Sequence, residues 1–96
     1  MTYTEKQRDT DNKTFEAVVD TLVKTHHKKS KDYGNSWRIL GLIGITIQIV
    51  HKAIRIWNLR DRPPENEALK DSYKDIAVYA IMAMMLISEG DINPRI

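Results

Sequence analysis

Apolar residues recur at helical spacing in the first third of the chain, between polar residues on either side. They stand at the i, i+3, i+4, i+7 and i+8 positions that form one face of an amphipathic helix. These residues are Phe15, Val18, Val19, Leu22 and Val23. The pattern predicts a helix from about Asp11 to Lys31, which Gly34 is expected to end.

Two more helical segments follow along the chain. The second is expected to have Ser36 as its N-cap and to run over residues 37–59, where an Arg-Asp-Arg-Pro-Pro sequence stops it because proline lacks the amide donor. The third begins near Asn66, whose side chain can cap the first turn, and runs to Glu89 before Gly90. No repeat and no pair of strands is indicated.

The start of the second segment, residues 39–50, is apolar nearly all round. Its β-branched residues favour strands on propensity. Gly41 and Gly44 each weaken a helix by about 1 kcal/mol relative to alanine, although they also let another helix approach closely. A helix that is apolar on every side must be covered on several faces. One helical hairpin cannot easily do this, so we expect a homo-oligomer with this helix near the interface.

Short connections make consecutive helices antiparallel neighbours. The expected fold is therefore all-α, a three-segment antiparallel helical bundle. We expect residues 1–96 to form a single helical domain, with a polar N-terminal arm at 1–10 and a short C-terminal tail at 90–96. The chain has no cysteine, which fits a cytoplasmic protein stabilised by packing alone. The N-terminus lacks a signal-peptide pattern, and the apolar run is shorter than the roughly 18 residues that indicate a membrane span.

The charge balance bears on the class of partner. The chain has 15 basic and 13 acidic residues and a net charge of +2. A general nucleic-acid binder usually has a domain pI above about 9 and clustered cations. The run Lys28–Lys31 is the one feature that favours such a binder, so any anion binding is expected to be local.

Charged residues at equal distances from a turn should lie at the same height, because an α-helix rises about 1.5 Å per residue. Counting from the loop after the second helix places Arg55 level with Asp71. The same count places Lys52 level with about Asp75, and the turn before this helix places Glu16 level with about Lys52. One end of the bundle is thus expected to gather Glu16, Asp20, Lys52, Arg55, Asp71 and Asp75.

The carboxylates of this group form two pairs. Asp71 and Asp75 are four residues apart and share a helix face. Glu16 and Asp20 have the same spacing. Two such pairs on facing helices could hold magnesium, the candidate cofactor, and the ion would bind phosphates. The alternative is that basic residues of the second helix neutralise the two aspartates as structural ion pairs, while the first pair faces solvent.

The opposite end carries the sequence HHKKSKDYGNSWR at residues 26–38. The helix dipole alone explains cations near the end of the first helix. Tyr33 and Trp37 could each offer a stacking face to a base, and Arg38 a bidentate clamp for a phosphate. The alternatives are that Trp37 is a core residue and that His26, which continues the apolar stripe, is too. Height counting separates the two ends within one chain, so a nucleotide site would be completed by another subunit.

Three ordered blocks carry a family resemblance. They are KDYGNSWR at 31–38, KAIRI at 52–56 with Asn58-Leu59, and NEALKDSYKDIAVYAI at 66–81. Over about residues 15–86 the chain resembles nucleotide modification associated domain, type one, a family of small helical phage and bacterial proteins. The resemblance implies an all-helical protein, often phage-encoded, that is associated with nucleotide chemistry.

A second likeness concerns the aspartate pair. Its arrangement looks like that of the MazG-type nucleoside triphosphate pyrophosphohydrolases, which bind magnesium with glutamates and an aspartate on two helices. Neither carboxylate pair in this chain is Glu-x-x-Glu or Glu-x-x-Asp, so the chain departs from that pattern.

Three functional hypotheses follow, in this order. The first is nucleotide binding without turnover, by a non-enzymatic protein in the cytoplasm of a bacterial host; a sponge for nucleotide signals of host immunity is an analogy. The second is a magnesium-dependent nucleotide pyrophosphohydrolase that uses the two carboxylate pairs, and the third is a nucleic-acid-binding module. The expected ligand-binding residues are His26, Lys29, Lys31, Tyr33, Trp37, Arg38, Lys52, Arg55 and Tyr79.

Overall fold

The computed structural model describes residues 2–90, apart from the side chain of Tyr33. In this range the chain forms three α-helices and no strand, which confirms the all-α prediction for the described residues. The elements are α1 (Glu5–Tyr33), the short 3-10 helix η1 (Ser36–Ile39), α2 (Gly41–Asn58) and α3 (Glu67–Glu89). No helix among them is long and apolar enough to span a membrane.

The chain divides into two compact units, Met1–Gly34 and Asn35–Ile96. The three-segment antiparallel bundle, the single domain and the homo-oligomer therefore stay predictions. The expected tail lies, except for Gly90, outside the described residues.

α1 is longer at its start than the apolar pattern indicates, because polar residues cap it. The backbone amide of Gln7 donates a hydrogen bond to the Thr4 hydroxyl (3.1 Å), and the backbone amide of Thr4 donates one to the side-chain oxygen of Gln7 (3.0 Å). This capping box starts the helix at Glu5 rather than near Asp11. Residues 5–10 are therefore helical. Gly34, with a φ of 60°, ends the helix as expected.

α2 begins later than expected. Residues 36–39 form η1, Ser36 is not an N-cap, and α2 starts at Gly41. The φ of Gly41 is 64°, a left-handed conformation that interrupts the helical path and that glycine adopts without strain. A Cβ added at Gly44 would lie 2.8 Å from Leu40 Cβ. Within the chain, the atoms nearest to such a Cβ belong to Leu40, in the preceding turn.

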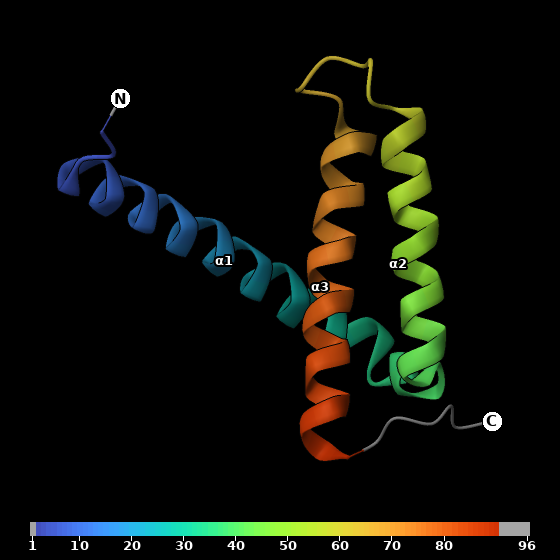
Figure 1. Ribbon diagram of the computed structural model, residues 1–96. Coiled ribbons are helices and arrows are strands. Elements are labelled where there is room, and N and C mark those ends of the chain that lie inside the picture. The colour runs from blue at the N-terminus through green and yellow to red at the C-terminus, as the bar shows by residue number, and fades with distance from the viewer. Residues whose placement is uncertain (1, 91–96) are drawn as a thin grey trace. The chain divides into compact units, whose positions relative to one another are not determined.

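α2 and α3 lie side by side and run in opposite directions, as Figure 1 shows in green and orange. Asn66 caps α3 by accepting a hydrogen bond from the Leu69 amide (3.1 Å), and Gly90 ends it in the left-handed conformation, both as predicted. Between the two helices lies the core. Its members are Ile45, Met82 and Leu86, with Trp37, Leu40, Ile49, Val78, Tyr79 and Ala83 packed against them.

Candidate functional site

Lys52 and Asp75 join the middle of α2 to α3. The Lys52 ammonium lies 3.0 Å from an Asp75 carboxylate oxygen, and both side chains are about 30% exposed. Height counting predicted that these residues would be level, and this contact confirms it. For Asp75 the structure shows a structural ion pair, which is the alternative to the magnesium site that the sequence left open.

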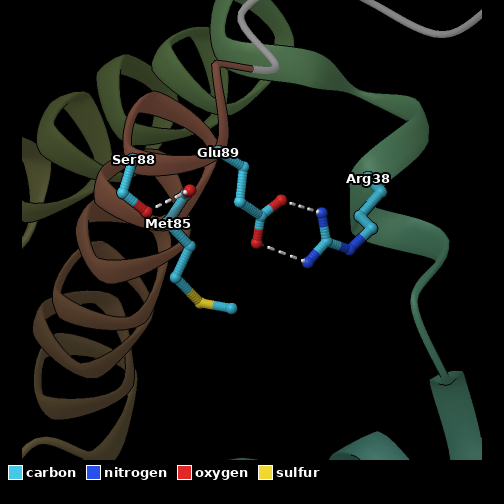
Figure 2. A network of polar contacts seen from close by, with 4 residues as sticks. All are labelled: Arg38, Met85, Ser88 and Glu89. Carbon is cyan, nitrogen blue, oxygen red and sulfur yellow. Dashed lines mark hydrogen bonds and ion pairs between the residues drawn. The ribbon is translucent and has the colours of Figure 1, made fainter.

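Arg38 and Glu89 form a second contact across the hairpin, between η1 and the last turn of α3. In Figure 2 the two terminal nitrogens of the Arg38 guanidinium face the two oxygens of the Glu89 carboxylate. The distances are 2.6 Å from Nη1 to Oε2 and 3.1 Å from Nη2 to Oε1. This is the parallel, bidentate geometry in which arginine binds carboxylates and phosphates most strongly.

Sequence reasoning missed Glu89, which it treated as the end of a helix. The signal was present, because Arg38 precedes Lys52 by 14 residues and Glu89 follows Asp75 by the same number. In two helices that run in opposite directions, such equal steps keep the partners level.

Trp37 adds an aromatic surface beside this contact. The guanidinium carbon of Arg38 lies 4.7 Å from the centre of the Trp37 ring, within the range of a cation–π interaction. Trp37 is half-buried and packs against the hairpin core, so the alternative that it is a core residue holds for part of its surface. The stack and the carboxylate together hold the Arg38 guanidinium in one orientation, with its side chain 24% exposed.

The two ion pairs lie at opposite ends of the hairpin core. Asp75 and Glu89 are separated by about 21 Å along α3, from a rise of 1.5 Å per residue. That distance is longer than the phosphate chain of one nucleotide. A single small ligand cannot use both Arg38 and Lys52 of one chain.

The other predicted site residues of this unit do not form a cluster. Arg55 and Asp71 are exposed and, in the described part of the chain, form no ion pair with each other. Tyr79 is half-buried and packs against the core, which limits the ring surface left for a base.

In α1 the predicted residues lie at the surface. Lys29, Lys31 and Glu16 are exposed, and Asp20 pairs with Lys24 at 3.0 Å within the same helix. His26 is half-buried, and its ring centre lies 6.4 Å from that of His27. The Tyr33 side chain lies outside the described residues.

The predicted four-carboxylate metal site spans the two units of the chain, so it stays a prediction. Within residues 2–90 no group of three or more histidine, aspartate or glutamate side chains is arranged to hold a metal ion. The candidate site that the structure does assemble is therefore the Trp37, Arg38 and Glu89 group.

These features define a small all-helical protein whose helical hairpin carries a clamped arginine at one end and a lysine–aspartate pair nearer the other. The chain belongs to the family described as nucleotide modification associated domain 1, whose model matches residues 29–87. This confirms the resemblance inferred from the three sequence blocks. Arg38 lies inside the matched residues and Glu89 just beyond them. Neither a curated protein nor a solved structure matches the chain.

Proposed function

We propose that the protein binds a phosphorylated nucleotide through Arg38 and Trp37, and sequesters it without converting it. The observation that carries the proposal is the Arg38 clamp, a guanidinium held in a bidentate geometry beside an aromatic ring. Such a guanidinium fits two oxygens of one phosphate. The family description, which concerns nucleotide modification, supports a nucleotide as the source of that phosphate.

Glu89 has a defined part in this proposal. Its two carboxylate oxygens stand in for the two phosphate oxygens that Arg38 would bind, so a nucleotide would displace Glu89 from the guanidinium. Glu89 is 41% exposed at its side chain and can turn toward water. The carboxylate then acts as a competitor within the chain that lowers the affinity of Arg38 for any anion, the nucleotide included.

The remaining predicted residues would complete the site from another subunit. Lys52 lies too far from Arg38 along the hairpin to reach the same nucleotide. We propose that Lys52 and Arg55 of a second copy supply further charge to the phosphates. A nucleotide-derived signal with several phosphates would suit such a shared site.

Calorimetry of the full chain, free of metal, with a panel of mono-, di- and cyclic nucleotides tests the proposal. We expect at least one of them to bind at micromolar concentration, and Arg38→Ala to weaken that binding tenfold or more, about 1.4 kcal/mol. Glu89→Gln removes the competing charge and should tighten binding several-fold. Glu67→Gln is the matched control, because it makes the same substitution in another ion pair of α3, with Lys70.

The opposite results are also defined. No binding by any nucleotide of the panel would remove the proposal. Unchanged affinity in Glu89→Gln, together with lower thermal stability, would make the Arg38 contact purely structural. Release of pyrophosphate from nucleoside triphosphates with magnesium, abolished in Asp75→Asn, would replace sequestration by hydrolysis.

A further inference from the structure

α2 carries a second apolar face that its contact with α3 leaves uncovered. Five large apolar side chains follow one line along the helix, and each is between 49% and 64% exposed. They are Ile43, Ile47, Val50, Ile54 and Trp57, and we call them the outer seam. Ile45 and Ile49, by contrast, face the core with α3.

The spacing of the outer seam is regular. Its members follow at intervals of four, three, four and three residues, which is the a/d pattern of a coiled coil. The line covers about 21 Å of helix at 1.5 Å per residue. Two heptads of strict a/d spacing form a narrow stripe of the kind that packs against another helix.

The positions beside the seam are small or neutral. In heptad terms the flanking e and g positions of α2 carry no lysine, arginine, aspartate or glutamate. They are Gly44, Thr46, His51, Ala53 and Asn58. In the pairing of two copies, like charges at facing flank positions would repel each other. Within α2 the outer seam avoids that cost, and just beyond the helix the Arg60 guanidinium lies 4.2 Å from the centre of the Trp57 ring.

We propose that the outer seam pairs with the outer seam of a second copy of this chain. The exposed surface of its side chains is roughly 500 Å² per chain, so pairing would bury on the order of 1,000 Å², the size at which a specific interface begins. The five side chains pack between the two copies of α2. This pairing does not depend on nucleotide binding, and it leaves the hairpin core and the Arg38 clamp intact.

Light scattering after size-exclusion chromatography tests the pairing in the full chain. The wild type should have the mass of at least two chains at about 50 μM, and Ile47→Glu with Ile54→Glu should lower the mass by at least twofold with helical circular dichroism retained. Ile81→Glu is the matched control, since Ile81 on α3 has the same exposed fraction as Ile47, 49%. Its mass should equal that of the wild type.

Cross-linking covers the case in which the double variant fails to fold. The chain has no cysteine, and Val50 lies at the middle of the seam, so two copies meet there in either direction of pairing. Mild oxidation of Val50→Cys should yield a disulfide-linked dimer, and Lys74→Cys, exposed on α3, should not. A wild type that is monomeric at about 50 μM would overturn the proposal. So would efficient cross-linking of Lys74→Cys alone.

Discussion

α1 and the α2–α3 hairpin are both helical, but different interactions hold them. The described polar contacts of α1 join residues at most eight apart in sequence, and Phe15 on its apolar face is 71% exposed. The hairpin joins residues far apart in sequence, through Arg38 with Glu89 and a buried core. An amphipathic pattern thus identifies a helix and its apolar face, whereas the neighbour that covers this face depends on the rest of the fold.

One pair of contacts makes the comparison direct. Lys24 with Asp20 in α1 and Lys52 with Asp75 in the hairpin are both lysine–aspartate pairs at 3.0 Å. The α1 pair is more than 60% exposed at each side chain, whereas the hairpin pair is about 30% exposed. Equal distance therefore does not imply equal stabilisation, because water screens the exposed pair more strongly.

The largest expected difference comes from apolar truncation. Ile45 is fully buried, so Ile45→Ala should lower the free energy of unfolding by about 2–5 kcal/mol through lost burial and a cavity. Phe15→Ala should change it by no more than about 0.5 kcal/mol. Urea unfolding followed by circular dichroism, at one protein concentration, measures both. An equal loss of free energy of unfolding in Phe15→Ala would show that the apolar face of α1 is covered in solution. It would then not differ from the hairpin core in this respect.

A smaller difference is expected between the two lysine–aspartate pairs. Asp75→Asn should lower the free energy of unfolding by about 1 kcal/mol, because Lys52 keeps its charge in a partly buried place. Asp20→Asn should lower it by less than about 0.5 kcal/mol. Thermal unfolding of the two variants in low and in high salt provides the measurement. If both variants lost the same free energy of unfolding, the exposure of the pair would not determine how much it stabilises the fold.

The smallest effect concerns the start of α1. The Tyr3 hydroxyl donates a hydrogen bond to the Asp11 carboxylate, which raises the pKa of Tyr3 above its ordinary 10.0. The contact should therefore be fully present at neutral pH and be lost as pH rises through the raised pKa, above 10. Ultraviolet titration should show that Tyr3 ionises late, and Asp11→Asn should bring the pKa of Tyr3 back to the ordinary range. The hairpin should show no change in that variant.

The height count predicted Lys52 with Asp75 because that pair depends on the length of one loop and the rise of a helix. The same rule applied to Arg38 would have found Glu89. It could not have found the break at Gly41, since a run of apolar residues gives the same pattern whether or not a left-handed residue interrupts it. Nor could it tell that Leu40, in the preceding turn, lies so close to Gly44.

The sequence by itself determined the three helices and most of their ends. Gly34, Asn66 and Gly90 act within a turn of their own position, and apolar periodicity needs no knowledge of distant residues. Only the tertiary structure decided that Glu89 binds the Arg38 guanidinium, and that Ile45, rather than the outer seam, faces α3. These outcomes depend on how two helices far apart in sequence meet, because each face of a nearly all-apolar helix is an equally good candidate until a neighbour covers one of them.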